Sequence, residues 1–198
     1  MKNNKTKWMI EVSMLSAIAI VLMLIEFPLP FIAPPFYKLD FSEIPVLIGT
    51  FAIGPLAGVV IEVIKVLLNL LINGTITGGI GELGNLLVGI MFVFPAGLIY
   101  KYKKTKQGAV LGLVSGSILM ILASSFVNAY ILIPAYGKAL GMPIESFVEM
   151  GKLIHPSINS LWYLVMLCVV PFNAIKVIID SFVVMLVYKP LKPILKVK

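Results

Sequence analysis

Cysteine and charge are both scarce in this chain. Its 198 residues include one cysteine, Cys168, which excludes an intramolecular disulfide and a CxxC metal site. Charged residues make up 13% of the sequence and hydrophobic residues 60%, and the mean hydropathy is +1.04. Because roughly a quarter of a soluble domain is charged, these few charges cannot cover a water-facing surface. Disorder is excluded as well, since it requires low hydrophobicity.

Several enzyme motifs are also missing. There is no GxxxxGK[ST] phosphate loop and no HExxH, so ATP hydrolysis and zinc proteolysis lack their usual machinery. The one histidine, His155, has no nucleophile near it in the sequence, and we interpret it as a surface residue. We therefore expect no catalytic residues, no metal site and no cofactor.

Long hydrophobic runs dominate what is present. They are continuous rather than alternating, which argues against a membrane β-barrel and predicts an all-α, polytopic integral membrane protein. We expect six transmembrane helices in a single membrane domain, residues 1–198. The expected spans cover about residues 8–27, 43–53, 55–73, 81–100, 107–135 and 160–188.

The basic residues are distributed as in a membrane protein. All of them are lysines, and most fall in three clusters beside apolar runs: Lys2, Lys5 and Lys7; Lys101, Lys103, Lys104 and Lys106; Lys189, Lys192, Lys196 and Lys198. This pattern is typical of cytoplasmic loops rather than of nucleic-acid contacts. We expect a bacterial-type plasma membrane location, with both termini and the 101–106 loop in the cytoplasm.

Parity decides how the stretch 44–72 crosses the membrane. If the N-terminal tail and the 101–106 loop are both cytoplasmic, an even number of spans lies between them. The runs at residues 8–27 and 81–100 supply two of these spans, so the stretch 44–72 must cross twice. We expect it to turn near Gly54-Pro55, because Pro favours the first position of a helix. The first of these crossings has only about a dozen residues, against the roughly 20 usually needed. It must be shielded by neighbours or span part of the bilayer.

Ionisable side chains inside apolar spans are functional candidates. Glu62 and Lys65 lie three residues apart, on one helix face, and a structural ion pair is the favoured interpretation. Asn173 and Lys176 share a face in the last span, and Asp180 follows one turn later. Two interpretations remain open there: a Lys176–Asp180 pair, or Asn173 and Lys176 facing a ligand cavity.

Three asparagines are expected to converge in the outer half of the membrane. Asn85, Asn128 and, more deeply, Asn173 would meet below a proline- and aromatic-rich outer loop, residues 28–42. Amides both donate and accept hydrogen bonds, whereas Lys176 only donates. Together they suit a neutral, planar ligand with carbonyl and N–H groups on one edge and apolar walls against its faces.

Four stretches from the first loop to the last span form a recognisable pattern. They are Leu39-Asp40-Phe41-Ser42-Glu43-Ile44-Pro45, Gly54-Pro55-Leu56-Ala57-Gly58 continuing to Glu62-x-x-Lys65, Asn128-Ala129-Tyr130-Ile131-Leu132-Ile133-Pro134-Ala135-Tyr136, and Pro171-Phe172-Asn173-Ala174-Ile175-Lys176. In these stretches the chain resembles the riboflavin-binding S components of energy-coupling factor (ECF) vitamin transporters. The Asp-Phe-Ser-x-Ile-Pro and Pro-Phe-Asn-x-x-Lys patterns are the specific ones.

The resemblance implies a six-helix subunit that captures riboflavin at the extracellular face. It implies a transmembrane coupling subunit and two cytoplasmic ATPases as partners. Asn128, Asn173 and Lys176 would contact the flavin, and the first outer loop, Tyr37 through Asp40 with Leu39 between them, would close over it. Asn85 is our own addition to this site.

The family's coupling contact is an Ala-xxx-Ala pair on the first helix. Ser13 and Ala17 stand nearest to it here, and small residues at this spacing let helices approach closely. Asp180 matches nothing in the family pattern. Two alternatives stay open: an S component for another vitamin, or a small ion-coupled carrier that uses Glu62, Lys65 and Asp180 as its relay.

Overall fold

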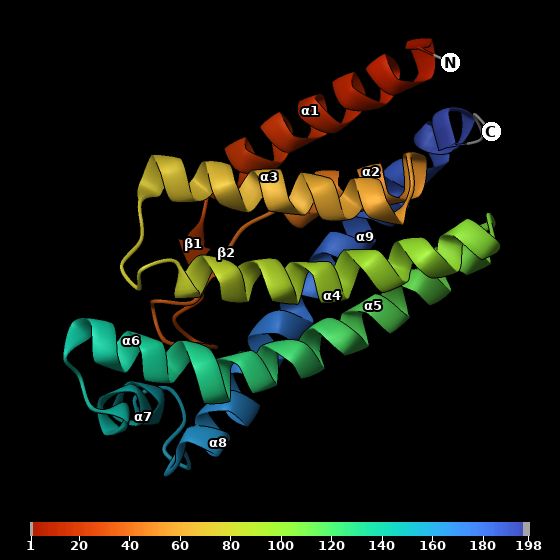
Figure 1. The fold of residues 1–198 in the computed structure, drawn as a ribbon. Coiled ribbons are helices and arrows are strands. Elements are labelled where there is room, and N and C mark those ends of the chain that lie inside the picture. Colours follow the sequence, from red (N-terminus) through yellow and green to blue (C-terminus); the bar gives the residue numbers. More distant parts are fainter. Residues whose placement is uncertain (1, 196–198) are drawn as a thin grey trace.

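The computed structural model describes residues 2–195, which form a helical bundle (Figure 1). Lys196 and Lys198 of the third lysine cluster lie outside the described residues. The helices are α1 (Lys2–Leu24), α2 (Glu43–Ala52), α3 (Pro55–Asn73), α4 (Ile80–Tyr102), α5 (Lys106–Val127), α6 (Ile133–Leu140), α7 (Ile144–Lys152), α8 (Leu161–Leu164) and α9 (Val170–Leu195). Two π-helical turns, η1 (Asn128–Leu132) and η2 (Val165–Val169), and two short antiparallel strands, β1 (Phe27–Pro28) and β2 (Lys38–Leu39), complete them.

Five helical segments of the described chain are long and apolar enough to cross a membrane. They are Lys5–Leu24, Pro55–Asn73, Ile80–Tyr102, Lys106–Leu140 and Leu161–Val187, whereas Glu43–Ala52 is a shorter apolar helix. The bundle therefore has the character of a multi-pass membrane protein.

The long helices run between two distinct ends of the bundle (Figure 1). The start of α1, the end of α9 and the α4–α5 connection, residues 103–105, lie at one end, which we call the lysine end. The α3–α4 connection and the segment α6–α8 lie at the other, which we call the loop end. The three lysine-rich parts of the sequence thus lie on the same side of the fold.

Helix α2 is too short to match its neighbours. Its 10 residues rise about 15 Å, half of the roughly 30 Å hydrocarbon core. The chain reverses at Gly54, whose φ of 141° suits only glycine, and Pro55 opens α3 as the expected turn requires. Seven residues of α2 are buried, including Val46, Leu47 and Phe51, and none of its residues is exposed. The expected shielding of this short helix is therefore present.

Of the prolines inside helices, Pro134 and Pro171 lie directly after π-helical turns. At the end of η1 the Ile133 N–H donates to the Asn128 carbonyl, five residues back, and Pro134 follows. At the end of η2 the Val170 N–H donates to the Val165 carbonyl, and Pro171 follows. A proline clashes with the carbonyl four residues before it, and the wider π turn relieves that clash. The fifth apolar run therefore continues past residue 135 to Leu140.

Helices α4 and α5 pack closely through small residues. A Cβ placed on Gly112 would lie 2.6 Å from the Ala96 carbonyl oxygen, and one on Gly116 would lie 2.3 Å from the Phe92 carbonyl oxygen. Glycine is the residue that permits this backbone approach in a lipid environment. The contact belongs to a first core cluster that joins α1–α5 and α9, whereas a second cluster joins the 29–41 loop to η1, α6, α7 and η2.

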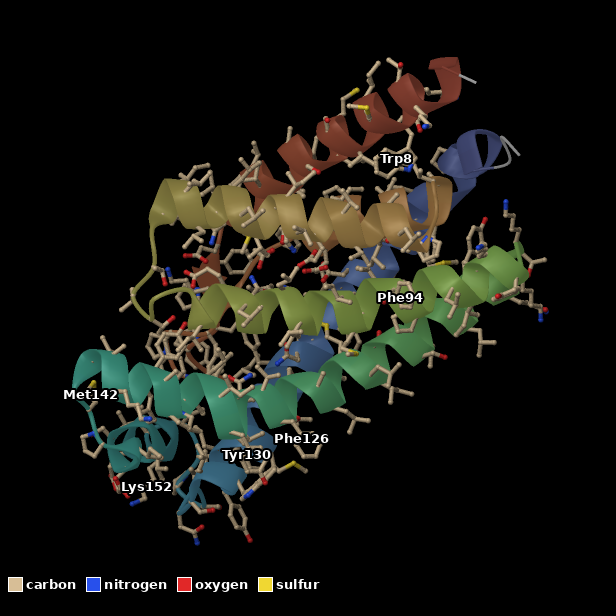
Figure 2. The ribbon with its side chains drawn as sticks, viewed as in Figure 1. Trp8, Phe94, Phe126, Tyr130, Met142 and Lys152 are labelled. Atoms are coloured by element: carbon tan, nitrogen blue, oxygen red, sulfur yellow. The ribbon has the colours of Figure 1, made fainter. Side chains whose placement is uncertain are left out.

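Exposed aromatic rings mark the long helix at the loop end. Phe126 and Tyr130 project from its outer side (Figure 2), stacked with ring centroids 6.1 Å apart, and Trp162 packs edge-on against both. Trp8 is exposed towards the lysine end. Aromatic side chains at both ends are typical of the two membrane–water interfaces.

Candidate functional site

A cavity of about 650 Å³ lies where the two core clusters meet. Val88 and Met120 line it from the first cluster, and Phe36, Tyr37 and Phe172 from the second. Its walls come from the end of α1, the 25–42 loop, α3, α4, α5 with η1, and α9. This volume is within the range of small-molecule sites.

Lys176 lines this cavity and bonds to the loop rather than to its own helix. Its Nζ donates to Asp40 Oδ2 at 2.8 Å, and the Ser42 N–H donates to Asp40 Oδ1 at 2.8 Å. Burial alone would raise the pKa of the Asp40 carboxyl, but the charges of Lys176 and Lys65 and these hydrogen bonds lower it to about 2. Asp40 is therefore ionised, and it joins the loop to α9 across the cavity.

Tyr37 makes a second connection between the loop and a long helix. Its hydroxyl donates to Asn128 Oδ1 at 2.6 Å, and Asn128 Nδ2 donates to the Ser124 carbonyl at 2.8 Å. Burial raises the pKa of the Tyr37 phenol, so it remains a donor. Because Asn128 begins the π turn η1, this chain of bonds also fixes where the helix widens.

Asn173 lies one turn before Lys176 on the same wall. Its Nδ2 donates to the Val169 carbonyl at 2.9 Å, and within residues 2–195 no hydrogen bond to its Oδ1 is formed. Beside it the Phe172 ring packs against Tyr37 with centroids 5.7 Å apart. This part of the wall therefore combines an aromatic face with an unused amide acceptor.

The other expected binding residues divide between the cavity and the core. Asn85 is half-buried on α4 and lines the cavity. Leu39 does not line it and packs into the second core cluster, with 2% of its surface exposed. Side chains alternate along a strand, so Lys38 and Asp40 face the cavity while Leu39 faces away. The sequence alone did not reveal this alternation.

The Glu62–Lys65 pair is formed, and it has a third member. Lys65 Nζ lies 2.8 Å from Glu62 Oε1 and 2.7 Å from Glu43 Oε1, and all three side chains are at most 1% exposed. Glu43 opens α2, where its negative charge also suits the helix N-terminus. The sequence predicted the pair on one helix face but could not reveal a partner 22 residues away.

Asp180 does not pair with Lys176. Among the residues that the structure describes, neither of its buried carboxylate oxygens has a hydrogen-bond partner, and Asp180 is 1% exposed. Of the two interpretations left open by the sequence, the structure therefore supports the one that places Asn173 and Lys176 at a cavity.

Several polar lining residues were not foreseen. Asn69 and Asn73 line the cavity from α3, and Asn73 Nδ2 donates to Asn69 Oδ1 at 2.9 Å. Both asparagines lie on the helix face of Lys65, because they follow it at intervals of four residues. This spacing could have identified them from the sequence. Glu26 and Lys38 form an ion pair at the β1–β2 hairpin and also line the cavity. Their approach depends on loop geometry, for which the sequence gives no periodic signal.

The donor set fits an organic ligand better than a metal. Among the described residues, no group of three or more His, Cys, Asp or Glu side chains could hold a metal ion. The cavity instead offers amide and ammonium groups beside aromatic and aliphatic walls, the combination that orients and encloses a planar polar molecule. Ser13 and Ala17 lie outside it, on the exposed face of α1.

The sequence is similar to those of known transport proteins over nearly its whole length. It is 37% identical over 192 residues to riboflavin transporter RibU of Staphylococcus aureus, covering 97% of this chain and 94% of that protein. It is 35% identical over 190 residues to riboflavin transporter FmnP of Bacillus subtilis, covering 96% and 94%. It is 34% identical over 194 residues to RibU of Streptococcus thermophilus, covering 96% and 85%.

The fold agrees with the sequence comparison. A solved structure described as the S component of a bacterial ECF transporter superposes with a TM-score of 0.75 and 37% identity, over 97% of this chain and 99% of that one. The family model for the substrate-specific component of ECF transporters matches residues 7–188. The predicted resemblance is confirmed, and the chain is a transport component rather than an enzyme. It belongs to the family of ECF transporter substrate-specific components.

Proposed function

We propose that this chain binds riboflavin in the 650 Å³ cavity and presents it for ATP-driven uptake. The observation that carries the proposal is the convergence of Asn128, Asn173 and Lys176 on one cavity beside Tyr37 and Phe172. Riboflavin has a planar ring system with carbonyl and N–H groups on one edge. Burial of the rings supplies affinity, and the polar edge supplies selectivity. The full-length similarity to proteins named riboflavin transporters supports the same ligand.

Each polar group has a role that its bonding state suggests. Asn173 Oδ1 accepts a hydrogen bond from a ligand N–H, because it accepts none from residues 2–195. The side chain is held in place by the bond from its Nδ2 to the Val169 carbonyl. Lys176 donates to a ligand oxygen while Asp40 holds its ammonium in place. Asn128 is oriented by Tyr37 and Ser124, and Asn85 offers a further amide from α4.

The 25–42 loop would cover the bound ligand. Tyr37 and Asp40 belong to this loop and bond to η1 and α9, so the loop is attached to two walls of the cavity at once. Release of either bond would separate the loop from that wall of the cavity. Leu39 contributes by anchoring the loop in the second core cluster.

We further propose that all six apolar helices cross or enter the bilayer in one domain, with the lysine end cytoplasmic. The half-length α2 and the full-length α3 form the crossing pair. The lysine-rich connection between α4 and α5 supports this orientation.

ATP-driven uptake requires ATPase partners, since this sequence contains no ATPase motif. We propose a transmembrane coupling subunit and two cytoplasmic ATPases. Ser13 and Ala17 would contact the coupling subunit, because they form an exposed small-residue strip on α1. Large apolar neighbours such as Met14 and Ile18 are exposed on the same helix.

A fluorescence titration of the detergent-purified chain with riboflavin tests the ligand assignment. We expect saturable quenching at one flavin per chain, and no competition from excess thiamine, biotin or folate. The riboflavin affinity measured by quenching should fall at least tenfold in Asn173→Ala and Lys176→Ala. It should remain unchanged in the exposed controls Asn159→Ala and Lys138→Ala. Unchanged affinity in both cavity variants would refute the site, and absence of quenching in folded protein would refute the ligand.

A further inference from the structure

A second, apolar groove of about 450 Å³ lies between α5 and α9. Its walls include Val114, Ile118, Ile178 and Phe182, which are 51%, 54%, 65% and 63% exposed. Two hydroxyl groups, from Ser117 and Ser181, also line it, and no ionisable side chain does. The cavity assigned to the transported ligand shares no lining residue with this groove, so the two are separate features of the surface.

The length of the groove matches one leaflet of a bilayer. On α5 it extends from Val110 to Ile121, and on α9 from Met185 back to Ala174. Eleven residue steps along either helix rise about 16 Å, close to half of the roughly 30 Å hydrocarbon core. Both walls therefore cover the depth that one acyl chain occupies, measured from the lysine end.

The groove begins where positive charge is concentrated. Lys106 precedes Val110 by four residues and lies on the same face of α5, and both Lys106 and Lys103 are exposed. On α9, Lys189 follows Met185 by four residues in the sequence. The start of α5 and the end of α9 lie at the same end of the bundle (Figure 1).

Negative charge is absent from the surrounding sequence. No Asp or Glu occurs between Glu82 and Glu145, or after Asp180. The α4–α5 connection and the end of α9 therefore contribute no acidic side chain beside the groove. An anionic headgroup held above an acyl chain would complement both the charge and the apolar walls.

We propose that the α5–α9 groove binds one acyl chain of an anionic phospholipid from the leaflet at the lysine end, with its phosphate held by Lys103 and Lys106. Such a lipid seals a groove that would otherwise leave exposed Val114, Ile118, Ile178 and Phe182 loosely packed against bulk lipid. It also fixes the depth of α5, which leads into η1 and Asn128, and of α9, which carries Lys176.

Lipid titrations of the delipidated, detergent-purified chain test this site without any vitamin. Phosphatidylglycerol and phosphatidylcholine with identical acyl chains are added separately, and bound lipid is counted by native mass spectrometry while Tm is followed. We expect one phosphatidylglycerol to bind at least about tenfold more tightly than phosphatidylcholine, and to raise Tm. Equal affinity for the two lipids would overturn the proposal.

Two variants locate the site. Lys103→Gln with Lys106→Gln should abolish the preference for phosphatidylglycerol, and Ser117→Leu, which fills the groove, should weaken both lipids. The matched control is Lys138→Gln with Lys152→Gln, which removes the same charge from the other end and should keep the preference. If the control loses the preference equally, or if Ser117→Leu binds both lipids as the original chain does, the groove is not the site. Ser117→Leu remains decisive even if the double lysine variant fails to fold.

Discussion

Single side chains join the 25–42 loop to the helices, and the Asp40–Lys176 pair is the one with a clear pH signature. The pKa of Asp40 falls from 3.8 to about 2 on folding. A lowered pKa stabilises the fold above the unfolded value, and the contribution, about 2 kcal/mol, is lost as pH falls from about 4 to 2. We therefore expect Asp40→Asn to lower Tm at pH 7 and to match the original chain near pH 2. A constant difference in Tm across this range would contradict the assignment.

Tyr37→Phe tests the other connection of the loop. Loss of the hydroxyl leaves Asn128 Oδ1 without its donor, which costs about 1–3 kcal/mol for a buried group. We expect a lower Tm and riboflavin binding weakened about tenfold, measured by flavin quenching. Tyr130→Phe is the matched control, because Tyr130 lies in the same π turn with its side chain exposed. Equal effects in the two variants would show that the bond to Asn128 is unimportant.

Lys65 is expected to be the most sensitive charged residue. Lys65→Met leaves two buried carboxylates, Glu43 and Glu62, without their cation, and breaking such a pair costs about 3–5 kcal/mol. The variant should show a strongly reduced Tm or fail to fold. Lys7→Met, which removes an exposed pair with Glu11, should change stability by less than about 1 kcal/mol. A Lys65→Met chain as stable as Lys7→Met would show that the buried network does not stabilise the fold.

At the scale of elements, the α4–α5 contact depends on two glycines. Gly116→Leu would force the helices apart, since even a Cβ there meets the Phe92 carbonyl oxygen at 2.3 Å. We expect a loss of at least about 2 kcal/mol, measured as reduced Tm or recovery of folded protein from detergent. Leu119→Ala, on the exposed face of α5, serves as the control and should have little effect. Tolerance of Gly116→Leu would mean that the helices are less closely packed than described.

Some features of the helices could be predicted from the sequence and others could not. Hydropathy and the Gly54-Pro55 turn located the apolar helices, because both signals are local. The π turns before Pro134 and Pro171 were not foreseen, since a proline indicates strain but not how the helix relieves it. The Asp40–Lys176 bond joins residues 136 positions apart, and no periodicity reports such a contact. Asn85, Asn128 and Asn173 were nevertheless predicted to converge, because polar residues in apolar helices are few enough to stand out, and all three line the cavity.

For the whole molecule, orientation in the membrane is the property to test. We expect Gln107→Cys, at the lysine end, to react with a membrane-impermeant maleimide only in permeabilised cells. Ser157→Cys, at the loop end, should react in intact cells, since both positions are exposed. The chain without added cysteine is the control, because its one cysteine, Cys168, is buried. Labelling of both positions from the same side would refute the proposed topology.

The half-length of α2 has a consequence for how so small a protein obtains an interior space. A six-helix bundle of equal members would fill its own centre with side chains. Here α2 has only about half of that length. The 25–42 loop, which precedes it, takes the place of two or three further helical turns towards the loop end. Loop residues Tyr37, Lys38 and Asp40, which lead into α2, thus line the cavity where further helical turns would have run. In the proposed function, the bound ligand therefore packs against a loop on one side and against helices on the others.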